Sequence, residues 1–122
     1  MGPQILIAED EHQLRQLLTE ILERKNLRVA QAADGVEALQ VLQERSSIQL
    51  LLSDIRMPRM DGYALVDKAL EVSPELKVLM MTAYAEERPP SSALRAREIR
   101  TLLKPFDPDK LGDLVHEMLA RP

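Results

Sequence analysis

Three runs of consecutive apolar residues constrain the fold of this 122-residue chain most strongly. They lie in the predicted strands Gln4–Ala8, Leu50–Leu52 and Lys77–Met81, without alternating polar residues. Such runs are typical of strands that are buried on both faces, as in a parallel sheet. The second run leads through Ser53 to Asp54, and a turn rich in Pro and Gly follows. A lone Asp at this place can simply cap a turn, so the rest of the chain decides its role.

The segments between these strands repeat apolar residues with the period of a helix. The first helix is expected to end near Asn26, and further helices are predicted over residues 34–44, 63–72, 91–97 and from 108 onward. Asp34 and Glu37 form a capping-box pattern. The predicted inward-facing residues are Leu14, Leu17, Leu18, Ile21, Leu22, Ala38, Leu39, Leu42, Leu65, Val66, Ala69, Leu70, Leu111, Leu114, Val115, Met118 and Leu119.

Two weaker strands complete the pattern, at Arg28–Ala32 and Thr101–Leu103. The first is more polar than the others and suits a sheet edge. Five strands that each precede a helix predict an α/β fold, in which helices cover both faces of a doubly wound parallel sheet. We expect residues 1–122 to form a single domain.

Composition excludes several classes of function. The formal net charge of -4 argues against a general nucleic-acid binder, because phosphate contacts need a basic surface. The chain has no cysteine, which excludes disulfides, thiolate catalysis and zinc–thiolate sites. No apolar run reaches the length of a membrane span and no secretory signal precedes the first strand, so a cytoplasmic location is the expectation.

Polar residues follow the confident strands at the point where each one ends. They are Glu9, Asp10, Asp54, Thr82 and Lys104. The carboxyl ends of parallel strands share one edge of a sheet, where open α/β sheets bind their ligands, so these side chains can converge on one cleft. Three carboxylates, a hydroxyl and an ammonium group are what a Mg²⁺-assisted phosphoryl transfer needs.

These residues and their spacing resemble the response-regulator receiver domains of two-component signalling, over essentially the whole chain. The resemblance rests on Glu9-Asp10, Asp54-Ile55-Arg56-Met57-Pro58-Arg59-Met60-Asp61-Gly62, Thr82-Ala83 and Lys104-Pro105-Phe106. It implies a flavodoxin-like (βα)5 fold with the strand order 2-1-3-4-5.

The resemblance also implies a phospho-acceptor. Asp54 would take a phosphoryl group from the phosphohistidine of a histidine kinase or phosphotransfer domain. A carboxylate is a weak nucleophile, so the reaction would depend on Mg²⁺ (or Mn²⁺) to neutralise charge. The metal ligands would be Asp10, Asp54 and the backbone carbonyl of Arg56, with Glu9 binding directly or through a water. Such a protein is not an enzyme in the ordinary sense, because it catalyses only its own phosphorylation and dephosphorylation.

Other site residues follow from the same resemblance. Lys104 would pair with one phosphoryl oxygen, and Thr82 would move to hydrogen-bond another. The peptide bond from Lys104 to Pro105 is expected to be cis. Arg56 and Tyr84 occupy positions that tune hydrolysis in the family, and both side chains are large enough to shield the phosphoryl group from water.

The chain departs from the family pattern in one region. Receivers usually carry Tyr or Phe three residues before the lysine, where the ring turns as the threonine moves, and here that position is Thr101. A Gly-Ala pair is commonly found where this chain has Arg97-Glu98, and Pro89-Pro90 restricts the preceding segment. Phosphorylation should still proceed, but the way in which this face reports it to a partner should be altered.

Two features allow more than one interpretation. The arginines 88, 95, 97 and 100 are either a solvated face or a contact surface for an acidic partner or a neighbouring receiver. His12 lies beside the cleft and is better explained as a surface residue than as a catalytic base. The expected partners are a kinase or phosphotransfer domain and an output domain or protein, with no nucleic acid and no membrane. A homodimer is conceivable through the face from the fourth helix to the fifth.

Alternative functions are weaker. A Mg²⁺-dependent phosphohydrolase with an Asp nucleophile typically needs a second acid two residues later, where this chain has Arg56. A nucleotide-binding domain lacks its Gly-rich loop after the first strand. A degenerate receiver that acts as a phosphorylation-independent binding module remains the main alternative, although the intact acidic residues, Thr82 and Lys104 argue against it. The sequence leaves open a stand-alone receiver or a piece of a longer regulator or hybrid kinase.

Overall fold

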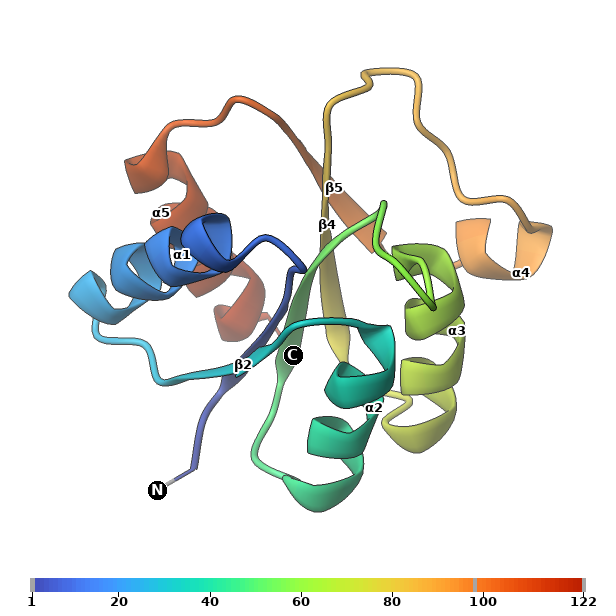
Figure 1. The fold of residues 1–122 in the computed structure, drawn as a ribbon, viewed down its shortest axis with the longest axis horizontal. Helices are drawn as coiled ribbons and strands as arrows, with labels where there is room; N and C mark the ends of the chain where they lie inside the picture. Colours follow the sequence, from blue (N-terminus) through green and yellow to red (C-terminus); the bar gives the residue numbers. More distant parts are fainter. Residues whose placement is uncertain (1, 98, 122) are drawn as a thin grey trace.

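Five parallel strands form one sheet in the order β2-β1-β3-β4-β5, which confirms the predicted fold class (Figure 1). The computed structural model describes residues 2–97 and 99–121, so Glu98 of the unusual Arg97-Glu98 pair lies outside the described residues. The strands are β1 (Ile5–Ala8), β2 (Val29–Ala32), β3 (Leu50–Asp54), β4 (Lys77–Thr82) and β5 (Ile99–Leu103). The helices are α1 (His12–Arg24), α2 (Gly35–Glu44), α3 (Gly62–Val72), α4 (Ser92–Arg95) and α5 (Pro108–Ala120).

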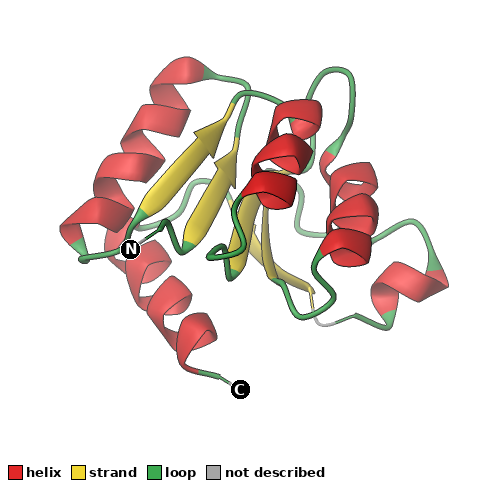
Figure 2. Ribbon diagram, turned by 90° about the horizontal axis from the view of Figure 1, so that it is seen from below, coloured by secondary structure: helices red, strands yellow, loops and turns green. Residues whose placement is uncertain are grey.

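The sheet separates two hydrophobic layers, with α1 and α5 on one face and α2 and α3 on the other (Figures 1 and 2). Successive side chains of a strand point to opposite faces. In β3, Leu51 therefore packs in the α2–α3 layer, while Leu50 and Leu52 pack in the α1–α5 layer. All three are completely buried, which explains why the run is apolar without alternation.

Apart from α1, the helices in the described part of the chain start at side-chain caps. Asp34 accepts a hydrogen bond from the backbone N–H of Glu37 at the start of α2, as the capping-box pattern predicts. Asp61 accepts from Ala64 at the start of α3, and Ser91 accepts from Leu94 at the start of α4. These caps set the points at which the chain turns back over the sheet.

Gly62 is required by close approach where α3 starts beside the end of β3. A Cβ built at this position would lie 2.4 Å from the carbonyl oxygen of Asp54 and 2.9 Å from Cα of Ile55. The backbone N–H of Gly62 also donates to the carbonyl of Ile55, at 2.8 Å. The absence of a side chain lets the loop from 55 to 61 fold tightly against the strand that carries Asp54.

Several predictions from the sequence need correction. β1 and β2 each begin one residue later than predicted, at Ile5 and Val29, and β4 extends one residue further, to Thr82. Leu17 is 51% exposed, because the buried face of α1 is centred on Leu18 and Leu22 and extends to Thr19, which is also buried. Helix α4 spans only four residues instead of 91–97. β5 begins at Ile99 rather than at Thr101, since parallel pairing with β4 extends it. α3 begins one residue earlier than predicted, at Gly62.

None of the helices in the described part of the chain is long and apolar enough to cross a membrane.

Adjacent leucines in α1 provide a matched test of this packing. Leu18 is completely buried, so Leu18→Ala should lower the free energy of unfolding by about 2–5 kcal/mol through lost transfer energy and an internal cavity. Leu17→Ala on the exposed side should change it by less than about 1 kcal/mol. Urea unfolding followed by circular dichroism measures both, and equal losses would contradict the assignment of the buried face.

Candidate functional site

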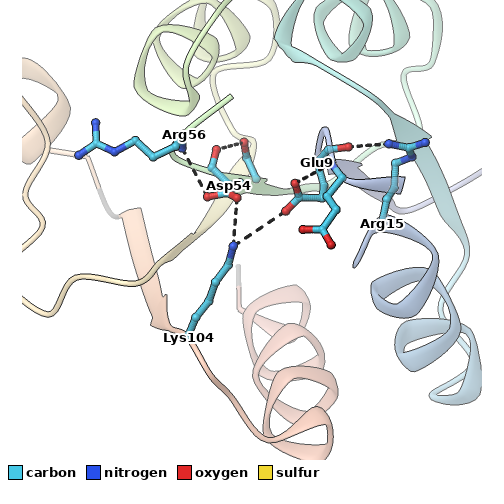
Figure 3. A network of polar contacts seen from close by, with 7 residues as sticks. Glu9, Arg15, Asp54, Arg56 and Lys104 are labelled. Atoms are coloured by element: carbon cyan, nitrogen blue, oxygen red, sulfur yellow. Dashed lines mark hydrogen bonds and ion pairs between the residues drawn. The ribbon is translucent and has the colours of Figure 1, made fainter. Parts of the chain in front are cut away.

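Glu9, Asp54 and Lys104, three of the residues predicted from the sequence, meet at the carboxyl ends of the strands (Figure 3). Glu9 and Asp10 follow β1, Asp54 is the last residue of β3, and Lys104 follows β5. The strand register places Ser53 of β3 beside Ala8 of β1, so the ends of these central strands are level. Parallel pairing alone therefore brings acids that are more than forty residues apart in the sequence into one cleft.

Three carboxyl groups form the floor of this cleft. Single oxygen atoms of Glu9, Asp10 and Asp54 all lie within 4.8 Å of one another. Glu9 is only 1% exposed, Asp54 is half-buried and Asp10 is exposed, so the cluster runs from the interior to the surface. Like charges this close repel each other unless a cation or a proton stands between them.

Lys104 supplies the positive charge of the cleft. Its Nζ lies 3.0 Å from Oδ2 of Asp54 and 4.0 Å from Oε1 of Glu9. Its backbone N–H donates to the carbonyl of Thr82 at 2.7 Å, which holds the end of β5 against the end of β4. The peptide bond that follows, to Pro105, is cis. One ammonium group therefore pairs with two of the three clustered carboxyl groups.

Glu9 is the most strained group electrostatically. One carboxylate oxygen accepts from the backbone N–H of Glu11 at 3.1 Å, but Oε1 is buried without a hydrogen-bond partner among the described residues. The pKa of Glu9 is raised to about 7, chiefly by burial and also by the neighbouring carboxyl groups of Asp10 and Asp54, against the lowering effects of the Glu11 N–H and Lys104. The cleft is therefore short of positive charge.

The donor set fits a small divalent cation. Mg²⁺ and Mn²⁺ prefer hard oxygen ligands, and Mg²⁺ needs only a few carboxylates because it keeps several waters. The buried Oε1 of Glu9, which accepts no hydrogen bond from the part of the chain that the structure describes, is the atom that such an ion or its water would reach. The backbone N–H of Arg56 lies 3.4 Å from Oδ1 of Asp54, so its peptide adjoins the cluster, while the role of its carbonyl stays a prediction.

Thr82 lies at the same edge but its hydroxyl is engaged locally. The side chain is buried, and Oγ1 accepts a hydrogen bond from the backbone N–H of Tyr84 at 3.0 Å. The ring of Tyr84 is exposed. Thr101, at the position of the missing aromatic, is also exposed on β5. Moving Thr82 toward Asp54 thus means giving up a contact within its own loop.

Two partners of the site escaped sequence reasoning. Arg15 donates from Nη1 to the carbonyl of Glu9 at 2.8 Å and so fixes the end of β1, while its Nη2 lies 3.1 Å from Nδ1 of the exposed His12. Glu87 binds the guanidinium of Arg56 at 3.2 Å, and Figure 3 shows the Arg56 side chain directed away from Asp54 and Lys104. No motif signals either contact, because ordinary surface residues make them across the fold.

The arginines near α4 bind backbone carbonyls. Arg88 donates to Glu87, Arg95 to Pro89 and Arg97 to Pro74, at 2.7–3.0 Å. These contacts fold the segment around the short helix, although the three side chains remain exposed. Both interpretations of the basic cluster, a solvated face and a contact surface, stay predictions.

Fold and site together define a doubly wound α/β domain with an acidic cleft, closed on one side by a lysine, at the carboxyl ends of its strands. A model of the response regulator receiver domain matches residues 5–116. The chain belongs to this family, as its sequence resemblance predicts.

Individual relatives agree with this assignment. The chain is 38% identical to the response regulator receiver protein CpdR of Brucella abortus (strain 2308), covering 93% of this chain and 92% of the relative. It is 32% identical to sporulation initiation phosphotransferase F of Bacillus subtilis (strain 168), covering 98% and 95%. A CheY-like receiver domain structure from Methanospirillum hungatei JF-1 superposes with a TM-score of 0.86 at 30% identity, covering 98% of this chain and 94% of the other.

The electrostatics of Glu9 predict an unusual pH dependence without metal. The pKa of Glu9 rises from its ordinary 4.5 to about 7 on folding, so its stabilising contribution is complete below about pH 4.5 and disappears as the pH rises through about 7. Glu9→Gln mimics the protonated form and should raise the free energy of unfolding by about 1–3 kcal/mol at pH 8, and hardly at all at pH 4.5.

Urea unfolding in EDTA at the two pH values measures this difference. Added Mg²⁺ should then stabilise the parent protein at pH 8 more than the Glu9→Gln variant, because the ion and the amide relieve the same repulsion. A variant that is less stable than the parent at pH 8 in EDTA would contradict the assigned strain.

Proposed function

We propose that this protein is a phospho-acceptor that takes a phosphoryl group from the phosphohistidine of a histidine kinase or phosphotransfer domain onto Asp54, in a Mg²⁺-dependent reaction. The observation that supports this most is the ion pair of Lys104 with Asp54, which is one of three clustered carboxyl groups. Membership of the receiver family makes signalling, rather than turnover of a small substrate, the purpose of the site.

Asp54 is the nucleophile in this proposal. Its carboxylate oxygen attacks phosphorus, an O–P bond forms as the N–P bond of the phosphohistidine breaks, and the imidazole leaves with its electron pair. Lys104, 3.0 Å from Asp54, neutralises the charge that gathers on the phosphoryl oxygens. A bound divalent cation, held by Glu9, Asp10, Asp54 and the carbonyl of Arg56, would supply the remaining charge neutralisation.

Thr82 would convert the new charge on Asp54 into a conformational change at the surface. Its hydroxyl would leave the Tyr84 N–H and donate to a phosphoryl oxygen, which draws the loop that follows β4 toward the cleft. The shifted loop changes the face that an output domain or protein contacts. A homodimer through α4, β5 and α5 stays a prediction, and so does binding without nucleic acid or membrane.

The alternative is a degenerate receiver that binds partners without phosphorylation. It is not favoured, because each residue that the chemistry needs is present and the acidic groups and lysine lie in contact. The departures from the family pattern, at Thr101, Arg97-Glu98 and Pro89-Pro90, concern the readout face and not the residues that carry the chemistry.

The first test is intact mass after incubation with acetyl phosphate and Mg²⁺. The parent protein should gain one phosphoryl group, which EDTA prevents and which Asp54→Asn lacks. Circular dichroism of the variant verifies its fold. A parent protein that gains nothing from acetyl phosphate and does not bind beryllofluoride (BeF₃⁻) would favour the binding-module alternative.

The lifetime of the acyl phosphate tests the two large side chains beside the site. Arg56→Ala combined with Tyr84→Ala should accelerate hydrolysis about tenfold, since less bulk then hinders in-line attack by water on phosphorus, a change of about 1.4 kcal/mol in the barrier. The first-order loss of the phosphorylated mass after removal of the donor measures the rate. An unchanged rate would exclude shielding by these residues.

A further inference from the structure

Glu87 occupies an unusual position for a loop carboxylate. Its side chain is only 13% exposed and accepts from two donors: Nη2 of Arg56 at 3.2 Å and the hydroxyl of Tyr63 at 3.2 Å. Arg56 belongs to the loop between β3 and α3, whereas Tyr63 is in the first turn of α3. One carboxylate thus joins the loop after β4 to both elements that follow the phospho-acceptor strand. We refer to Arg56, Tyr63 and Glu87 as the Glu87 latch.

The latch is connected to Thr82 through a short turn. The backbone N–H of Glu87 donates to the carbonyl of Tyr84 at 3.2 Å, and the N–H of Tyr84 donates to Oγ1 of Thr82 at 3.0 Å. Residues 82–87 therefore behave as one hydrogen-bonded unit. When Thr82 moves inward and its hydroxyl leaves the Tyr84 N–H, this turn loses its hydrogen bond to the end of β4, which changes how firmly Glu87 is held.

Glu87 is also the anchor of this loop on the α3 side. Residues 83–91 are joined to α3 and to the β3–α3 loop by two polar side-chain contacts among the described residues, and Glu87 makes both of them. The arginines 88 and 95 bind carbonyls within their own segment instead. The Glu87 carboxylate thus holds the position of the loop.

Arg56 has a second anion within reach. Its backbone nitrogen lies 3.4 Å from Oδ1 of Asp54, and its side chain is 70% exposed and long enough to turn either way. A phosphoryl group on Asp54 carries more negative charge than one carboxylate, with three acceptor oxygens that suit a guanidinium. Phosphorylation therefore creates a competitor for the cation that Glu87 holds.

We propose that the Glu87 latch is a charge-exchange switch, in which the Arg56 guanidinium is held by Glu87 in the unphosphorylated protein and passes to the phosphoryl group on Asp54, releasing the loop from α3. This inference rests on the proposed function. Glu87 acts as a positioning residue that favours the unphosphorylated state. The route passes from the site to the surface without the ring that is missing at Thr101.

The energetics define the test. A ligand shifts a two-state equilibrium only by its difference in affinity for the two states. Breaking the ion pair in the unphosphorylated state should therefore tighten binding of BeF₃⁻, a mimic of the phosphoryl group. Glu87→Gln removes the charge that holds Arg56 but keeps an oxygen that accepts from Tyr63. It should lower the dissociation constant about two- to fivefold, as expected for a single ion pair whose cation is exposed to solvent.

NMR titration with BeF₃⁻ at saturating Mg²⁺ measures the dissociation constant. The decisive comparison repeats Glu87→Gln in an Arg56→Ala background, where most of the gain should disappear because the exchanged cation is gone. Glu86→Gln is the matched control, since Glu86 is exposed on the same loop and has no polar partner among the described residues, and it should leave the affinity unchanged.

A second readout needs neither metal nor phosphoryl mimic. In the free protein in EDTA, Glu87→Gln should accelerate amide hydrogen exchange in residues 83–91 without changing exchange in the sheet. Unchanged exchange in the loop would overturn its anchoring by Glu87. A gain in BeF₃⁻ affinity that persists fully in the Arg56→Ala background would overturn the charge exchange.

The outcomes separate this inference from the proposed function. A parent protein that binds BeF₃⁻, with Glu87→Gln of the same affinity, would overturn the latch and leave the phospho-acceptor intact. A parent protein that neither binds BeF₃⁻ nor accepts a phosphoryl group would overturn the proposed function and the charge exchange together.

Discussion

Parallel pairing of β3 between β1 and β4 is the constraint on which the rest of the structure depends. It buries β3 on both faces, which requires consecutive leucines, and it makes the strands end at the same edge. Because Glu9 and Asp54 each stand at such an end, the pairing that forms the core also forms the acidic cluster. The close approach at Gly62 then keeps the next loop against this edge.

The cleft brings carboxyl groups together at an electrostatic cost to the stability of the fold. A buried carboxyl group, beside two further acids and one lysine, is electrostatically costly when one of its oxygens has no hydrogen-bond partner among the described residues. Its raised pKa expresses the same imbalance of charge. A cation bound in such a site stabilises it by offsetting the repulsion between the carboxylates. A negative group added there has a large electrostatic effect, because few positive charges offset it.

The sequence predicts the strands, the long helices and the cleft residues, because their signals are local: apolar runs, helical periodicity and polar residues at strand ends. It wrongly predicts that Leu17 is buried, since the helical period of apolar residues does not show which side of the apolar face packs against the sheet. It overestimates α4, where few apolar residues define the limits. It misses Glu87, whose partners lie 31 and 24 residues away and belong to no motif, so that only the folded structure brings them together.

The two hydrophobic layers on opposite faces of the sheet have a mechanical consequence. Tyr63 packs against the layer of α2, α3 and α4, whereas α1 and α5 pack against the other layer. The loop that responds to Thr82 is therefore anchored to one half of the molecule alone. The half that contains α1 can therefore keep its shape while the loop after β4 moves against the opposite half, so that a local change at Thr82 alters one face of the domain and leaves the other unchanged.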